Sequence, residues 1–144
     1  MRYLALDLGD RYIGIAISDL TGMLARPLEV MLRTSRAADF AHIGALVQKH
    51  HADAIVVGLP FNMDGTEGSQ AAWVRDYSAD LSKTLAIAIH LWDERLTTEE
   101  AADIMRAQGK RPTKDWIDAV AAAVILQSYL DAQARASANS NAHL

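Results

Sequence analysis

The sequence predicts an α/β fold with a mixed five-stranded sheet and helices on both of its faces. Three β-rich segments come first, and helical and strand-like segments alternate after them. This order is typical of a sheet that starts with antiparallel neighbours and continues with parallel ones. The uninterrupted apolar run at residues 54–59 supports this prediction, because a strand covered by helices on both faces is apolar throughout.

The boundaries of the elements follow from apolar periodicity and from turn-forming residues. Strands are expected at residues 2–8, 11–18, 24–32, 54–59 and 86–92. Helices are expected at residues 36–50, 69–83, 98–107 and 115–132. Pro60 ends the fourth strand, and Gly109 separates the last two helices.

A chain of 144 residues is long enough for one domain with a substantial core, here expected over residues 1–132. The Ala/Ser/Asn-rich residues 133–144 are expected to form a disordered tail. No apolar stretch approaches the roughly 18 residues of a membrane span. Because a predicted strand begins at residue 2, we expect no secretory signal. The absence of cysteine excludes disulfides and thiolate metal sites, and we expect a cytoplasmic location.

Three carboxylates stand at the edges of predicted core elements. Asp7 lies inside an apolar strand, Glu94 follows the strand at 86–92, and Asp118 opens the apolar stretch of the last helix. Burial of an unpaired charge is unfavourable, so such groups are normally neutralised, paired or bound to a metal. Asp118 and Glu94 could instead cap helices, but Thr113, Asp115 and Thr97 are better placed for that role. The three acids together favour a divalent-metal site.

The net charge of −4 argues mildly against a nucleic-acid partner, yet the cations are unevenly distributed. A group of cations with no acid among them lies shortly before Asp118: Arg106, Lys110, Arg111 and Lys114. This group is either a solvated surface or a phosphate-binding loop beside the acidic site.

Four linked motifs resemble those of the YqgF/RuvX family of RuvC-like Holliday junction resolvases and pre-16S rRNA nucleases. They are Asp7-Leu8-Gly9 with Ile13-Gly14-Ile15-Ala16, residues 57–66, Asp93-Glu94-Arg95-Leu96-Thr97-Thr98 and Ile117-Asp118-Ala119. The resemblance covers residues 2 to about 131. It implies an RNase H-like fold, metal-dependent hydrolysis of phosphodiester bonds, and Asp7, Glu94 and Asp118 as the catalytic acids. Lys114-Asp115-Trp116 departs from the Gly/Lys-rich stretch that is more usual in the family.

The expected cofactor is Mg²⁺ or Mn²⁺, because both ions prefer hard oxygen ligands. Asp115 lies three residues before Asp118 on the same helix face, where it is either a fourth ligand or a first-turn cap. The expected substrate contacts are Arg11, Asn62, Arg95, Lys110, Arg111 and Lys114. Arg95 has the alternative of pairing with Asp93.

The expected partner is nucleic acid, either precursor 16S rRNA, with ribosomal particles as a further partner, or branched DNA. A monomer or weak homodimer is expected, since no long exposed apolar helix stripe is evident. Two other functions stay open. One is a non-catalytic nucleic-acid-binding factor that retains the acids. The other is an actin-like ATP phosphotransferase, although such enzymes need two domains of this kind, and the chain has no phosphate-binding Gly-x-x-x-x-Gly-Lys-Ser/Thr loop.

Overall fold

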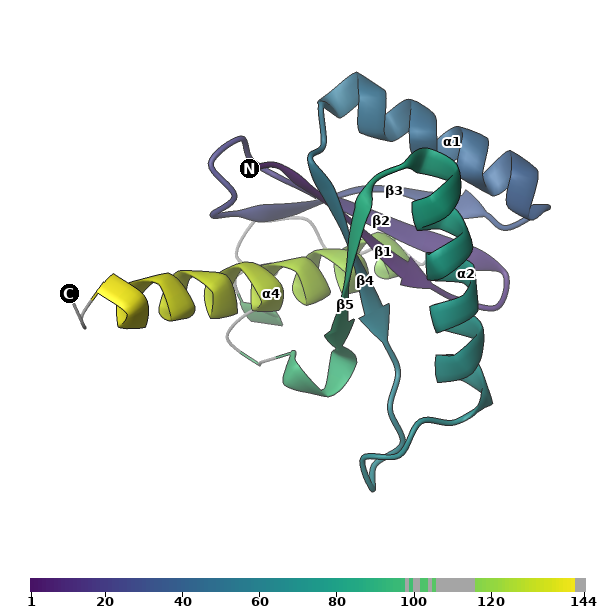
Figure 1. Cartoon of the computed structure of the whole chain (residues 1–144). Helices are drawn as coiled ribbons and strands as arrows, with labels where there is room; N and C mark the ends of the chain where they lie inside the picture. Colours follow the sequence, from purple (N-terminus) through teal and green to yellow (C-terminus); the bar gives the residue numbers. More distant parts are fainter. Residues whose placement is uncertain (98, 100–101, 104, 106–115, 142–144) are drawn as a thin grey trace.

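The computed structural model describes residues 1–97, 99, 102–103, 105 and 116–141, and it contains one five-stranded sheet (Figure 1). The strands are β1 (Tyr3–Leu8), β2 (Tyr12–Ser18), β3 (Ala25–Leu32), β4 (Ala54–Leu59) and β5 (Ala88–Asp93). Their order is β3-β2-β1-β4-β5. β1 is antiparallel to β2 and parallel to β4, so the predicted mixed sheet is confirmed.

Helices cover both faces of this sheet, as predicted. α1 (Arg36–His50) and α2 (Ser69–Leu85) lie on one face, and α4 (Ile117–Asn141) crosses the other (Figure 1). A short 3₁₀ turn, η1 (Glu94–Leu96), follows β5 directly. No helix in the described part of the chain is long and apolar enough to cross a membrane.

The two faces of the sheet differ in the size of their side chains. Large aliphatic residues of β1, β2 and β4 point toward α1 and α2 and form the larger core. The opposite face presents small residues, including Ala5 and Ala16, to the alanines at 122 and 123 of α4. Small side chains on both partners let the axis of α4 approach the sheet closely. This close approach determines where the beginning of α4 lies.

Two boundaries differ from those expected for a clear physical reason. β5 begins at Ala88 rather than at residue 86, because Ala86 adopts a left-handed conformation (φ 51°) that ends α2. α4 continues past residue 132 to Asn141, in a segment whose Ala, Gln and Arg residues have high helix propensity. The helix expected at residues 98–107 lies mostly outside the described residues. The division into a domain over residues 1–132 and a disordered tail stays a prediction.

Candidate active site

Asp7 lies near the end of β1, on the face of the sheet that α4 covers. Side chains alternate along a strand, so Asp7 shares this face with Ala5, while Leu6 and Leu8 belong to the core on the other side. Asp7 is half-buried. The strand therefore holds a carboxylate on a surface that is otherwise apolar and is largely covered by a helix.

Gly14 brings the beginning of α4 against the sheet beside this acid. Gly14 is the antiparallel partner of Asp7 in β2. A Cβ atom at Gly14 would collide with the backbone carbonyl oxygen of Asp118, and it would lie 3.0 Å from the amide nitrogen of Ala119. Only glycine permits this contact, so the first turn of α4 lies on the strand directly adjacent to Asp7.

Gly58 performs the matching role on the other side of β1. Leu6 pairs with Val57 in the parallel β1–β4 ladder, so Gly58 continues β4 alongside Asp7. A Cβ atom at Gly58 would lie 2.8 Å from Oε1 of Glu94 and 2.7 Å from Cδ1 of Ile125. The Glu94 side chain thus occupies the space left by the missing Cβ, over the strand next to Asp7.

Ser128 attaches the turn that carries Glu94 to α4. Its buried hydroxyl accepts a hydrogen bond from Nε1 of Trp92 at 3.1 Å and donates one to the carbonyl of Leu96 at 2.7 Å. These bonds join the end of β5 and η1 to the helix that supplies Asp118. No sequence pattern indicates this role, because a serine within an apolar helix can bond to many partners.

The carboxylates influence one another electrostatically. Burial, followed by the negative charge of Asp118, raises the pKa of Asp7 from 3.8 to about 6. Burial, followed by the charges of Asp7 and then Asp93, raises the pKa of Glu94 from 4.5 to about 7. Asp7 is the member that couples to both of the others. Its strand position thus concentrates negative charge in a partly desolvated place, where a cation would relieve the repulsion.

The three predicted acids are brought to one region, but they do not form a closed ligand shell. Among the residues that the structure describes, no three Asp, Glu, His or Cys side chains lie close enough to hold a metal ion as they stand. The donor set itself fits a hard divalent cation, since it consists of carboxylate oxygens with raised pKa values at two of three positions.

Arg95 pairs with Asp93, which is the alternative that the sequence left open. Its guanidinium donates to both carboxylate oxygens of Asp93, the closest at 2.7 Å. The guanidinium carbon of Arg95 lies 4.8 Å from the ring centroid of Phe61. One face of Arg95 is thus occupied by protein, although the residue is exposed and can still contact a phosphate.

Asn62 is engaged within its own loop. Its Nδ2 donates to Oγ1 of Thr66 at 3.0 Å, and its backbone amide donates to the carbonyl of Thr66 at 2.8 Å. Arg11 is exposed in the turn between β1 and β2, with its guanidinium 5.9 Å from the ring of Tyr12. Contacts of Asn62 and Arg11 with substrate stay predictions. Lys110, Arg111, Lys114 and Asp115 lie outside the described residues.

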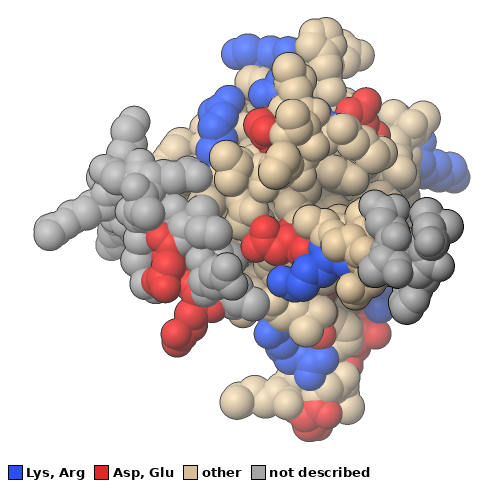
Figure 2. Space-filling model, turned by 90° about the vertical axis from the view of Figure 1, so that its left-hand side faces the viewer, with Lys and Arg blue, Asp and Glu red and all other residues tan. Residues whose placement is uncertain are grey.

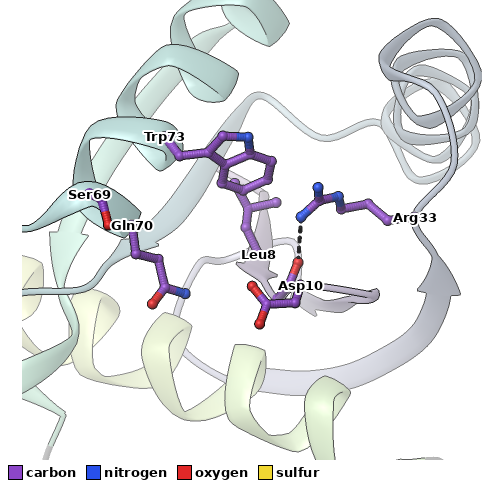
Figure 3. A pocket seen from close by; sticks show the side chains of 7 residues that line it. Leu8, Asp10, Arg33, Ser69, Gln70 and Trp73 are labelled. Atoms are coloured by element: carbon purple, nitrogen blue, oxygen red, sulfur yellow. Dashed lines mark hydrogen bonds between the residues drawn. The ribbon is translucent and has the colours of Figure 1, made fainter.

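A pocket beside Gly9 was not anticipated from the sequence. It has a volume of ≈ 440 Å³ and opens where the end of β1, the end of β3 and the beginning of α2 meet (Figure 3). Its lining residues are Leu8, Gly9, Asp10, Arg33, Ser69, Gln70 and Trp73. Sequence analysis could not assemble this group, because residues 33 and 69–73 reach Gly9 only through the tertiary fold.

Positive and negative side chains are interspersed on the face shown in Figure 2. The described lysines and arginines on this face form small groups beside acids rather than one broad basic band. Some described cations are paired with acids, as Arg36 is with Asp76 at 2.9 Å.

Comparison with known proteins identifies the family. The model of the family described as "RuvX: Holliday junction resolvase" matches residues 1–132. A protein of Anaeromyxobacter sp. named "Putative pre-16S rRNA nuclease" is 45% identical over 133 residues, covering 91% of this chain and 97% of its own. A protein of Thermoanaerobacter pseudethanolicus with the same name is also 45% identical, over 140 residues, with 92% and 98% covered.

Solved structures support the fold. RuvC of Thermus thermophilus superposes with a TM-score of 0.62 at 14% identity, over 92% of this chain and 97% of its own. The fowlpox virus resolvase bound to Holliday junction DNA gives a TM-score of 0.54 at 10% identity, over 92% and 99%. The RNase H-like fold is thereby confirmed. The family model matches residues 1–132, and relatives share 45% sequence identity with the chain. The chain therefore belongs to the RuvX family.

Proposed function

We propose that this protein is a divalent-metal-dependent nuclease that hydrolyses phosphodiester bonds of precursor 16S rRNA. Family membership and the names of the relatives support nuclease activity. The observation that carries the site assignment is the row formed by Gly14, Asp7 and Gly58. The two glycines admit Asp118 on one side of Asp7 and Glu94 on the other.

Asp7, Glu94 and Asp118 are proposed to hold Mg²⁺ or Mn²⁺. When bound, such ions polarise the phosphoryl group and favour formation of the attacking hydroxide. The chain contributes a rigid β1 that fixes Asp7 and a Ser128-anchored turn that carries Glu94. Burial of Asp7 and Glu94 limits their contact with water, which would strengthen their electrostatic interactions with a bound ion.

Precursor rRNA is proposed as the substrate because the relatives of about 45% identity are named for it. Cleavage of Holliday junctions is the second candidate, and the description of the family model favours it. A junction has two symmetry-related strands and requires paired active sites, whereas trimming one RNA end requires only one. We propose a monomer or weak dimer, acting in the cytoplasm on RNA within precursor ribosomal particles.

The test is cleavage of two labelled substrates side by side. One is a fragment that spans the 5′ boundary of 16S rRNA in its precursor, and the other is a four-way DNA junction. Metal-dependent cutting of the RNA at a defined position supports the proposal. Paired, symmetric nicks in the junction by a stable dimer, with intact RNA, would instead assign the resolvase activity. Light scattering on the same samples reports the oligomeric state.

A further inference from the structure

The pocket beside Gly9 contains a cation, Arg33, that neighbouring groups hold in place. Nη1 of Arg33 donates to the carbonyl oxygen of Gly9 at 2.8 Å (Figure 3), and its guanidinium carbon lies 4.2 Å from the ring centroid of Trp73. In the part of the chain that the structure describes, Arg33 forms no ion pair with a carboxylate. Its charge is therefore oriented at low entropic cost and available to an anion.

Three polar side chains complete the lining without partners of their own. Asp10, Ser69 and Gln70 are exposed, and within the described residues their side chains make no hydrogen bond or ion pair. An ionised Asp10 side chain accepts hydrogen bonds but cannot donate them, whereas the side chains of Ser69 and Gln70 can do both. A ligand that fills the pocket must therefore offer a hydroxyl or amine to Asp10 as well as an anion to Arg33.

A ribonucleotide meets both requirements. Its phosphate is the anion, and its 2′-hydroxyl is a donor that a deoxyribonucleotide lacks. The pocket volume of ≈ 440 Å³ lies within the range of about 300–1,000 Å³ typical of small-ligand sites. A simple phosphate site would not place Asp10 in the lining, because a carboxylate repels phosphate.

The pocket is also close to the proposed site of cleavage. Asp10 follows Asp7 by three residues, which corresponds to about 10 Å of extended chain. Successive phosphates of one strand are about 3.4 Å apart along the axis of a helix, so the pocket is within a few nucleotides of a phosphate bound at Asp7. The side chains of Asp7 and Leu8 point to opposite faces of β1. A nucleic-acid strand that reaches both Asp7 and the pocket would therefore cross the edge of the sheet at Gly9.

We propose that this pocket binds a ribonucleotide of the substrate strand a few positions from the cleaved bond, and that Asp10 selects RNA over DNA by accepting a hydrogen bond from its 2′-hydroxyl. Arg33 binds the phosphate of the same nucleotide, and Gln70 supports the contact with its sugar. The placement relative to the cleaved bond rests on the proposed nuclease function, whereas the selection of RNA by the pocket does not.

The test measures binding without cleavage. Dissociation constants are determined by fluorescence anisotropy, with chelator present, for a single-stranded RNA about 12 nucleotides long from the 5′ boundary of precursor 16S rRNA and for DNA of the same sequence. Wild-type protein is expected to bind the RNA about tenfold more tightly. Asp10→Ala should bring this ratio close to one, and Arg33→Met should weaken both ligands by similar factors.

Two controls remove equal charges elsewhere. Asp76→Asn on α2 and Arg135→Met on the exposed part of α4 should leave the RNA-to-DNA ratio unchanged. A second approach alters the ligand: RNAs with one 2′-deoxy position each should show one position that weakens wild-type binding but not binding by Asp10→Ala. Gln70→Ala, at an exposed helix position, serves if Asp10→Ala unfolds, and should lower the ratio in part.

The outcomes separate the pocket from the nuclease function. An RNA-to-DNA ratio that Asp10→Ala and Gln70→Ala leave unchanged, or the absence of any sensitive 2′ position, would overturn the pocket proposal. Cleavage is measured separately with Mg²⁺ or Mn²⁺. RNA-selective binding that depends on Asp10, without cleavage by wild-type protein, would contradict the nuclease function and leave the pocket proposal intact.

Discussion

The backbone carbonyl of Asp118 lies against Gly14, in the space that any side chain at position 14 would occupy. Gly14 is also the β2 partner of Asp7. Two of the three proposed metal ligands are thus positioned by one contact between a helix and a glycine. The free energy of folding and the geometry of the site are linked at this point.

Gly14→Ala should therefore displace the beginning of α4. We expect a decrease of about 1–3 kcal/mol in the free energy of unfolding, as for other overpacked interiors, and loss of metal-dependent activity. Urea denaturation and cleavage assays measure the two effects. Gly44→Ala is the control, because its Cβ would meet only the flexible Cδ2 atom of Leu85, at 3.0 Å. Gly44 also lies within α1, where alanine has a higher helix propensity than glycine. Equal effects of the two substitutions would contradict the assigned role of Gly14.

Asp7→Asn should abolish cleavage while the protein stays folded, because it removes a carboxylate that metal binding would stabilise. Divalent ions at about 100 times their Kd should raise the wild-type melting temperature by about 5 °C or more. The variant should show a much smaller shift, and the surface variant Asp76→Asn should behave as wild type. Equal metal-induced shifts in all three proteins would place the ion elsewhere.

The free energy of unfolding of the metal-free protein should depend on pH between about 4 and 8. The pKa of Asp7 is about 6 and that of Glu94 about 7 in the folded protein, both above their ordinary values. The folded state thus binds more protons than the unfolded state in this window, so the free energy of unfolding falls as pH rises and levels off above about pH 8. For Asp7 the change is at most about 3 kcal/mol.

Urea denaturation with chelator at several pH values measures this slope. Asp7→Asn should flatten it markedly, and it should also be more stable than wild type at about pH 8, because the repulsion with Asp118 and Glu94 is removed. Stability of wild-type protein that rises through this window would show that other groups dominate.

Ser128→Ala should weaken the attachment of the Glu94 turn to α4. Nε1 of Trp92 and the carbonyl of Leu96 would both lose their partner, at a cost of about 1–3 kcal/mol in stability. We expect a weaker apparent affinity for Mg²⁺ in cleavage assays as well. Ser82→Ala is the control, since Ser82 makes a similar bond to a backbone carbonyl at the opposite end of β5. A loss of metal affinity in both variants would indicate a general effect of stability.

Neutralising Lys110, Arg111 and Lys114 together should weaken binding of nucleic acid. If each contacts one phosphate, the slope of log K against log salt should fall by about one for each phosphate that is no longer bound. Anisotropy titrations at several salt concentrations measure this slope. An unchanged slope would show that these cations are only solvated.

Much of the fold was predictable, because strands covered on both faces and amphipathic helices have local signatures. The site acids could be nominated for a similar reason, since Asp7 in an apolar strand is a local anomaly. The roles of Gly14 and Gly58 were not predictable, because they depend on which atoms of distant elements approach them. The start of β5 was misplaced because the left-handed turn at Ala86 has no glycine to indicate it.

The pocket at Gly9 marks the limit of the sequence patterns most clearly. In the sequence, Arg33 is one of several cations that flank the predicted strand at residues 24–32, and Trp73 is one apolar position in the predicted helix at residues 69–83. Their stacking, 4.2 Å from guanidinium carbon to ring centroid, arises from the packing of α2 beside the end of β3. Local periodicity contains no information about such a contact.

The central claim is that Asp7, Glu94 and Asp118 together hold the metal ion with which the protein cleaves phosphodiester bonds. The most direct measurement is the rate at which wild-type protein, Asp7→Asn, Glu94→Gln and Asp118→Asn cut the labelled precursor rRNA fragment, with Mg²⁺, with Mn²⁺ and with chelator. We predict cutting by wild type only with metal, and a decrease of at least about a hundredfold in each folded variant. Cleavage that persists in chelator, or that any of the three variants performs at the wild-type rate, would contradict the account.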